Sequence, residues 1–406
     1  MENLHELQWE TFYFLVFGIS LSFALLFTPL AKRLALYFDI VDRPGGRKIH
    51  TTVIPYLGGL AIYAAFWLGV GLSMPNHIAQ LTAIIFAGTM VMLLGLWDDR
   101  NGMTPIVKLC GQATAAIIVY IAGIGFDVCD YEIINFGVSV FWIVGLSNAM
   151  NLLDNMDGLS GGSTLISSFF LFLLAVCNGQ FLVAGMSLSL MGACLGFLHY
   201  NFAPASIFMG DAGSLFLGFI TSVICMKLRP LIEGDLVSFC VAVTLLGLPV
   251  LDTSLVTIHR VLNGRRWYEG GKDHLSHRLV LMGLSKTNAV LVLYAVSASY
   301  GFLSVLLNIV GVHALILALV GVYSLFLFVG FSQVNPYVPR QEGLPDAQPA
   351  TASAVHSSPV HSKPVHLKPA HSKPANTSPA TSSPDTASPA HSSPAHSSPA
   401  HSTPAR

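Results

Sequence analysis

The chain has 406 residues, of which 53% are hydrophobic and only 10% charged, and its mean hydropathy is +0.64. Soluble domains carry about a quarter charged residues, so this composition excludes an ordinary soluble protein and predicts a membrane protein. The net charge of −1 excludes nucleic acid as a partner, because binding a phosphate chain requires a dense basic surface.

Eleven apolar runs, each close to the length that crosses a bilayer, follow one another along the chain. They centre on residues 11 to 30, 56 to 73, 78 to 97, 106 to 125, 133 to 149, 161 to 177, 181 to 200, 213 to 228, 236 to 257, 287 to 309 and 312 to 331. Acidic residues precede the first run and no A-x-A site follows it, so we expect a span there and not a signal peptide. The predicted fold class is an all-α polytopic membrane protein with about 11 transmembrane helices.

The basic residues predict the orientation, because Lys and Arg near span ends are retained in the cytoplasm. The odd-numbered loops hold 13 of them, whereas the even-numbered loops hold two, Lys227 and Arg229. We therefore expect the N-terminus outside, and the odd-numbered loops and the C-terminus in the cytoplasm.

The composition changes near residue 340, and proline then recurs every five residues from Pro359 to Pro404. A Pro/Ser/Ala/His repeat of this kind cannot bury a core. We expect a membrane domain over residues 1–335 and a disordered cytoplasmic tail over residues 340–406.

Three groups of acidic and amide residues follow apolar runs or open them. Asp98 and Asp99 end the third run, in GLWDDRNG, where two carboxylates suit a Mg²⁺ ion or a base. An isolated pair would favour a solvated helix end instead. In NAMNLLDNMDGLSGG, Asn148 and Asn151 precede Asp154, Asp157 and Gly158. The alternative for this second motif is hydrogen bonding between helices followed by a turn.

The third group contains Asp211, which lies in MGDAGS at the start of a predicted helix, where free backbone N–H groups favour phosphate. A helix N-cap is the equally weighted alternative for this residue. In the loop after the ninth run, GGKDHLSHRL carries His274, His277 and Arg278, which can bind phosphate or relay protons.

The loop after the first run adds Arg47, Lys48 and His50, in RPGGRKIH, for which ordinary flanking charge is the alternative. All five constellations fall in odd-numbered loops. The orientation deduced from Lys and Arg alone thus predicts one cytoplasmic site for phosphate and metal.

In this order, the motifs resemble those of the polyprenyl-phosphate N-acetylhexosamine-1-phosphate transferases, glycosyltransferase family 4. The resemblance spans about residues 12 to 331 and comprises the RKxH…GG loop, DD…PxxKL, NxxNLxDxxDGL, NFxPAxxFMGDAGS and HxxHR. The sequence resembles the GlcNAc-1-phosphate branch more than the phospho-MurNAc-pentapeptide branch, because DHLSHR lacks a triple-His segment. It departs from the pattern of many members at Asn155, Ser160 and Ser276.

The resemblance implies an enzyme of the bacterial inner membrane that moves a sugar phosphate from a UDP-N-acetylhexosamine to a polyprenyl phosphate and releases UMP. It implies Mg²⁺ as cofactor, with Mn²⁺ able to replace it. Asp211, Asp154 and Asp98 are the expected metal ligands. The expected catalytic residues are Asp98, Asp99, Asp211 and His274. The expected substrate contacts are Asn151, Asp154, Asp157, Gly158, Lys108, His277, Arg278, Arg47, Lys48, His50 and Asn201.

Two other functions stay open at this point. One is the pentapeptide transferase of peptidoglycan synthesis. The other, from a different class, is a cation-coupled transporter that would use Asp252, an acid inside the ninth run. The sequence does not give the oligomeric state, and a homodimer stays open as well.

Overall fold

A computed structural model of the protein describes residues 2–42, 53–72, 78–230, 235–266, 268, 270–310 and 313–337. The chain divides into one unit, Met1–Gln341, and a second unit, Glu342–Arg406, and every described residue belongs to the first. The predicted tail and the loop residues Arg47, Lys48 and His50 lie outside the described residues.

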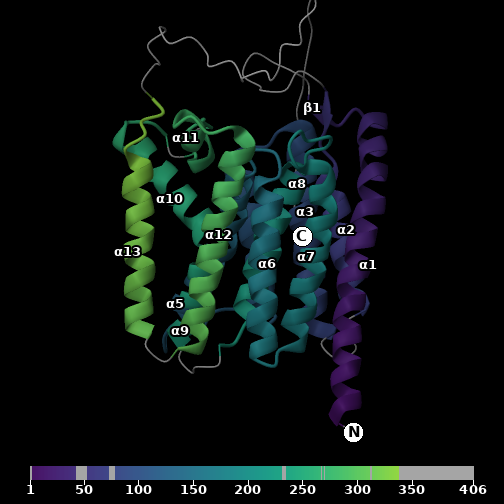
Figure 1. Cartoon of the computed structure of the whole chain (residues 1–406). Coiled ribbons are helices and arrows are strands. Elements are labelled where there is room, and N and C mark those ends of the chain that lie inside the picture. Colours follow the sequence, from purple (N-terminus) through teal and green to yellow (C-terminus); the bar gives the residue numbers. More distant parts are fainter. Residues whose placement is uncertain are drawn as a thin grey trace, which may run out of the picture. The chain divides into compact units, whose positions relative to one another are not determined.

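The described part of the first unit is almost entirely helical (Figure 1). Its helices are α1 (Glu2–Tyr37), α2 (Gly58–Leu72), α3 (Ile78–Asn101), α4 (Pro105–Ile121), α5 (Glu132–Leu153), α6 (Leu159–Cys177), α7 (Phe181–Asn201), α8 (Gly210–Lys227), α9 (Asp235–Leu245), α10 (Gly247–Leu262), α11 (Leu275–Leu281), α12 (Lys286–Ile309) and α13 (His313–Ser332). Two short strands, β1 (Val41–Asp42) and β2 (Ile54–Pro55), pair antiparallel, with Val41 opposite Pro55.

Each predicted apolar run coincides with a helix or with a pair of helices, which confirms the polytopic helical fold. Among the described residues, eight helices are long and apolar enough to cross a membrane, and α9 with α10 forms a ninth candidate bent by 77°. The helices α2 and α4 fall short of that length. At 1.5 Å per residue, α2 spans only about 22 Å of a hydrocarbon core about 30 Å thick.

Helix α8 lies at the centre of the bundle and packs against α3, α5 and α2. In its most apolar window, 89% of the residues are buried. Close packing with α3 depends on Gly95, because a Cβ atom there would lie 2.5 Å from the backbone nitrogen of Ala212. The backbones of α3 and α8 therefore approach closely where the acidic residues of both helices lie.

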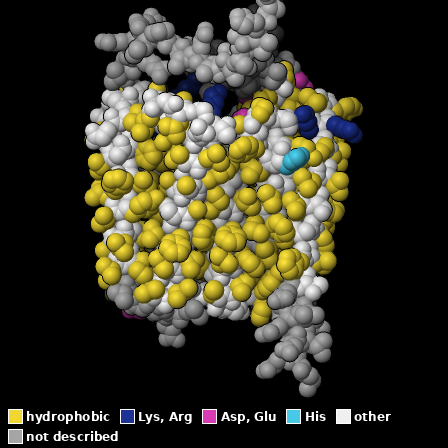
Figure 2. Space-filling model, viewed as in Figure 1, with side chains coloured by type: hydrophobic (Ala, Val, Ile, Leu, Met, Phe, Trp, Pro, Cys, Tyr) yellow, Lys and Arg dark blue, Asp and Glu magenta, His cyan; other side chains and the backbone are white. Residues whose placement is uncertain are grey.

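The described parts of the loops that carry the predicted site meet at one end of the bundle. In Figure 1 this is the end with β1 and α11, whereas the N-terminus of α1 and helix α9 lie at the other end. Figure 2 shows a side wall of hydrophobic side chains, with the visible Lys and Arg side chains near the β1 end. Exposed residues such as Phe14 and Phe326 fit an environment of lipid. These loops are all odd-numbered. Their meeting at one end agrees with the prediction that the odd-numbered loops lie on the same side of the membrane.

Candidate active site

The ends of α3, α4 and α8 bring two carboxylates to one ammonium group. The Lys108 Nζ atom donates a hydrogen bond of 2.8 Å to Asp98 Oδ2 and a second one to Asp211 Oδ2. The side chains are partly exposed, at 14% for Lys108, 16% for Asp98 and 30% for Asp211. Two acids thus converge on one positive charge, which leaves this position with excess negative charge.

Asp211 is held in place from α5. The Asn151 Nδ2 atom donates to Asp211 Oδ1 at 2.8 Å and to Ser214 Oγ at 2.9 Å, which uses both hydrogens of the amide. The orientation of the Asp211 carboxylate is therefore fixed by a neighbour that carries no charge.

The neighbouring acid Asp99 has a different task, because it caps helix α8. Its two oxygens accept hydrogen bonds from the backbone N–H groups of Asp211, at 2.8 Å, and Ala212, at 3.1 Å. These groups have no partner inside the helix. Gly210, with φ of +68°, makes the approach possible, since a Cβ there would lie 2.5 Å from Asp99 Oδ2. Asp99 therefore fixes the start of α8 and leaves Asp98 facing the cation.

Asp154 follows the last residue of α5, and burial raises its pKa to about 8, with further contributions from the carboxylates of Asp211, Asp99 and Asp157. An acid that has a pKa near neutrality and lies close to several other carboxylates is typical of a functional site. Asp98, Asp99, Asp154 and Asp211, together with Lys108, form what we call the acidic cluster.

The residues predicted next to it mainly hold loops together. Asp157 Oδ2 accepts a hydrogen bond from the Ala205 N–H at 2.9 Å. Gly158, with φ of +79°, donates its N–H to Asn201 Oδ1 at 3.1 Å, and its carbonyl accepts the Tyr294 hydroxyl at 2.6 Å. Asn201 is 2% exposed and donates to the Ile207 carbonyl, so these contacts fix the turn between α5 and α6 to the loop before α8.

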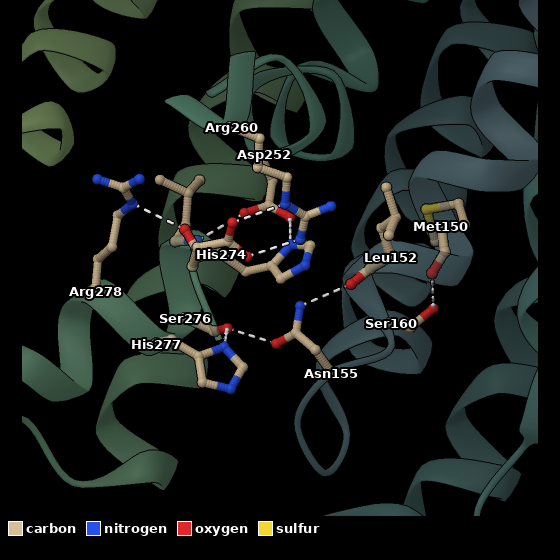
Figure 3. A network of polar contacts seen from close by, with 12 residues as sticks. Met150, Leu152, Asn155, Ser160, Asp252, Arg260, His274, Ser276, His277 and Arg278 are labelled. Atoms are coloured by element: carbon tan, nitrogen blue, oxygen red, sulfur yellow. Dashed lines mark hydrogen bonds and ion pairs between the residues drawn. The ribbon is translucent and has the colours of Figure 1, made fainter. Parts of the chain in front are cut away.

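A second cluster, around α11, is built on buried contacts between acids and basic side chains (Figure 3). His274 Nδ1 lies 2.7 Å from Asp252 Oδ2, and the Leu275 N–H donates to Asp252 Oδ1 at 2.7 Å. Asp252 thus orients the imidazole and caps α11 at once. Asp252 is the acid on which the transporter alternative depends, and these two contacts use both of its carboxylate oxygens.

The side chain of Arg278, which the sequence predicts as a substrate contact, is buried and bonded to backbone carbonyls. The side chain is 0% exposed and its Nε atom donates to the Asp273 carbonyl at 2.9 Å. Its Nη1 atom donates to the carbonyls of Phe331, at 3.0 Å, and Val334, at 2.6 Å. The guanidinium therefore fastens the end of α13 to α11, and in Figure 3 it points away from His277.

Sequence reasoning missed the ion pair beneath this segment. Arg260 contacts Asp273 through two hydrogen bonds of 2.7 Å, and the Tyr337 hydroxyl donates to Asp273 Oδ2 at 2.6 Å. These donors hold the pKa of Asp273 at about 2, against the opposing effect of burial. Tyr294 was missed as well, because a tyrosine within a long apolar run gives no signal of a loop contact.

Asn155 and Ser276 join the two clusters. Ser276 Oγ lies 2.5 Å from Asn155 Oδ1 and 3.3 Å from His277 Nδ1. Burial, followed by the charge of His274, lowers the pKa of His277 to about 4. His277 is therefore neutral at neutral pH.

No group of three or more His, Cys, Asp or Glu side chains within the described residues has the geometry of a metal cage. Asp98 and Asp211 nevertheless share one ammonium, so their oxygens already converge on a cation. Mg²⁺ typically binds one or two carboxylates and completes its shell with water and substrate phosphates. The donor set at this position fits such an ion.

Comparisons with known proteins identify relatives of the chain. Residues 81–229 match the model of glycosyl transferase family 4. A Bacillus subtilis protein named "Probable undecaprenyl-phosphate N-acetylglucosaminyl 1-phosphate transferase" is 34% identical over 328 residues, which cover 78% of this chain and 89% of the relative. The decaprenyl-phosphate N-acetylglucosaminephosphotransferase of Mycolicibacterium smegmatis is 33% identical over 66% of this chain and 75% of its own length.

A more distant relative, the undecaprenyl-phosphate alpha-N-acetylglucosaminyl 1-phosphate transferase of Escherichia coli, is 23% identical over 70% of this chain and 81% of its own length. All three relatives are named for the same transfer to a polyprenyl phosphate. The family match covers α3 to α8, the helices that supply the acidic cluster. The chain belongs to glycosyl transferase family 4.

Proposed function

We propose that the protein transfers N-acetylglucosamine-1-phosphate from UDP-N-acetylglucosamine to a polyprenyl phosphate and releases UMP. The observation that carries the proposal is the convergence of Asp98 and Asp211 on the Lys108 ammonium at the ends of membrane helices. A lipid phosphate and a nucleotide diphosphate are both anions, and a cation position beside apolar helices can receive both. The names of the relatives supply the sugar and the class of acceptor lipid.

The reaction is one displacement at phosphorus. An oxygen of the lipid phosphate attacks the β-phosphorus of the UDP-sugar and forms a new P–O bond. The bond from that phosphorus to the bridging oxygen breaks, and its electron pair leaves with UMP. Phosphoryl transfer depends mainly on positioning and on neutralisation of charge, so little covalent chemistry is asked of the protein.

The chain's own residues divide this work. A substrate phosphate competes with the two carboxylates for the hydrogen bonds of Lys108, and the ammonium then neutralises a phosphate oxygen. Asp98 orients the lipid phosphate and accepts its last proton. Asn151 keeps the Asp211 carboxylate in place. His274, oriented by Asp252, donates to the diphosphate or to the sugar.

We propose Mg²⁺ as the cofactor, held by Asp211 and Asp98 with Asp154 beside them, and Mn²⁺ as a substitute. When bound, the ion would neutralise phosphate charge at the reacting centre. Lys108 and the ion would then share the negative charge of the acids and the substrates. The fit of the donor set supports this assignment and does not require a cage of three acids.

The basic residues of the odd-numbered loops support a site on the cytoplasmic face of the bacterial plasma membrane. UDP-sugars would then enter from the cytoplasm. Labelling of Asn101→Cys, at an exposed residue at the end of α3, in a variant without the native cysteines checks this placement with a reagent that does not cross the membrane.

The decisive assay offers purified protein UDP-N-acetylglucosamine, polyprenyl phosphate and Mg²⁺, and measures UMP release and the mass of the lipid product. Asp211→Asn should abolish Mg²⁺-dependent release of UMP. A second readout is thermal unfolding, in which Mg²⁺ at about 100 times its Kd should stabilise the wild type by about 2.7 kcal/mol and Asp211→Asn far less.

The matched control is Asp127→Asn, an exposed acid outside both clusters whose contact with Arg229 is 4.0 Å long. This variant should keep wild-type turnover and the response to Mg²⁺. Turnover by Asp211→Asn at the wild-type rate would refute the assignment of Asp211. A wild type that forms no lipid product from this donor would refute the choice of sugar.

A further inference from the structure

Asn155 and Ser276 lie in hydrogen-bond contact with each other. Asn155 follows Asp154 in the turn between α5 and α6, whereas Ser276 lies in the first turn of α11. Figure 3 shows the two side chains pointing toward one another, with His277 beside them. A chain of hydrogen bonds therefore runs from the end of α5, next to Asp154, to a histidine of α11.

The direction of each hydrogen bond in this chain follows from chemistry. Asn155 Nδ2 donates to the Leu152 carbonyl at 2.8 Å, which turns Oδ1 of the amide toward Ser276. An amide oxygen only accepts, so the Ser276 hydroxyl donates its single hydrogen to it. The Ser276 oxygen is then left as an acceptor for His277 Nδ1, 3.3 Å away.

The tautomer of His277 is thereby determined, because its partner at Nδ1 can only accept. The hydrogen of the neutral imidazole lies on Nδ1, and Nε2 carries a lone pair. The low pKa of His277, about 4, keeps the ring in this neutral form at neutral pH. Among the described residues, Nε2 has no hydrogen-bond partner, and the ring is partly exposed while Ser276 and His274 are buried.

A lone pair on Nε2 selects the kind of group that His277 can bind. Phosphate oxygens are acceptors and find no hydrogen on this atom, which argues against the diphosphate as its partner. A sugar hydroxyl or an amide N–H has the hydrogen that Nε2 lacks. The geometry thus favours the sugar or the base of a nucleotide sugar over its phosphates.

We propose that Asn155 and Ser276 are positioning residues that hold His277 with its hydrogen on Nδ1, so that Nε2 accepts a hydrogen bond from a hydroxyl or amide N–H of the bound nucleotide sugar. The proposal rests on the proposed function for its substrate. Without the hydrogen-bond chain, the ring would exchange between its two tautomers, and only one of them accepts at Nε2.

The tautomer is tested by ¹⁵N NMR of the full chain labelled at histidine and embedded in lipid nanodiscs. His277→Gln identifies the His277 signals by their loss. The wild type should show a protonated Nδ1 and an unprotonated Nε2, and Ser276→Ala should show both tautomers. A protonated Nε2 in the wild type, or an unchanged tautomer in Ser276→Ala, would overturn the inference.

The substrate part is tested by steady-state kinetics. Asn155→Ala and Ser276→Ala should each raise KM for the nucleotide sugar about three- to tenfold, as expected for one neutral hydrogen bond, and leave kcat within about twofold. The double variant should be no worse than either single one, because both residues act through His277. Ser276→Thr keeps the hydroxyl and should retain the wild-type KM.

The matched control is Ser285→Ala, which removes a serine that accepts the Asn288 N–H at the start of α12 and should leave KM unchanged. Additive effects of the two alanine variants, or a loss of kcat at constant KM, would overturn the positioning role. A wild type that consumes no nucleotide sugar would refute the proposed function and the substrate with it. The NMR result would still decide the tautomer in that case.

Discussion

The two polar clusters at one end of the bundle differ in how their charges are matched. In the acidic cluster, two carboxylates share the single ammonium of Lys108, and the groups in contact are 14–30% exposed. In the α11 cluster, Arg260 and His274 each face one acid, Asp273 and Asp252, and none of these side chains is more than 4% exposed. The acidic cluster has spare acceptors and access to solvent, whereas these four side chains are almost fully buried.

The pKa values of two acids follow the same contrast. Burial and neighbouring carboxylates raise the pKa of Asp154 to about 8, whereas the hydrogen bonds from Arg260 and Tyr337 hold that of Asp273 at about 2. Excess negative charge is costly unless a cation joins it, and a balanced buried pair gains nothing from a ligand. The comparison favours the acidic cluster as the place where ligands bind and the α11 cluster mainly as its support.

The largest expected effect is on stability, from breaking the balanced pair. Arg260→Leu leaves the Asp273 carboxylate buried without its ion partner and should lower the free energy of unfolding by about 3–5 kcal/mol. Unfolding of the detergent-solubilised protein measures this. Arg229→Leu, at an arginine that is 57% exposed, is the matched control and should change little. Equal losses in both variants would contradict the contrast between the clusters.

The next effect separates two neighbouring acids by function. Asp98→Asn weakens the cation position and should lower kcat about 10²–10³-fold, as measured for lost electrostatic contacts in other enzymes, with little change in stability. Asp99→Ala removes the cap of α8 and should cost about 1–2 kcal/mol of stability. Rates and melting curves of both variants, side by side, check the division. If both lost activity at unchanged stability, Asp99 would be more than a cap.

The smallest effect is a dependence of stability on pH. The pKa of Asp273 is lowered in the folded protein, from 3.8 to about 2, so its contribution is present above pH 4 and is lost as pH falls toward 2. A shift of this size corresponds to about 2 kcal/mol. Melting temperatures between pH 6 and pH 3 should fall more steeply for the wild type than for Asp273→Asn. Parallel curves would indicate that Asp273 is not the group responsible.

The fold was largely predictable because apolar runs leave few alternatives in a membrane. The count of 11 spans was less secure: α2 and α4 are short, and the break between Leu245 and Gly247 depends on tertiary packing. Composition reveals that a segment is apolar. It does not reveal whether the segment crosses the bilayer or ends within the bundle.

The site was predictable as a set of acids in loops of the same parity, but the division of roles was not. Asp98 and Asp99 are adjacent in sequence, yet one contacts Lys108 and the other caps α8, because successive side chains on a helix point about 100° apart. Arg278 looked like a phosphate ligand, since an arginine in sequence carries no sign of its burial. The partners of such residues come from helices far away in the chain.

The position of Asp98 and Asp211 at the ends of apolar helices has a kinetic consequence. The nucleotide sugar is dissolved in water, whereas the acceptor lipid moves in the plane of the bilayer, so its effective concentration is a mole fraction within the membrane. Adding inert phospholipid or detergent at constant bulk amounts should therefore slow the reaction by surface dilution. Saturation curves for the acceptor should coincide only when they are plotted against that mole fraction, while those for the nucleotide follow its molarity.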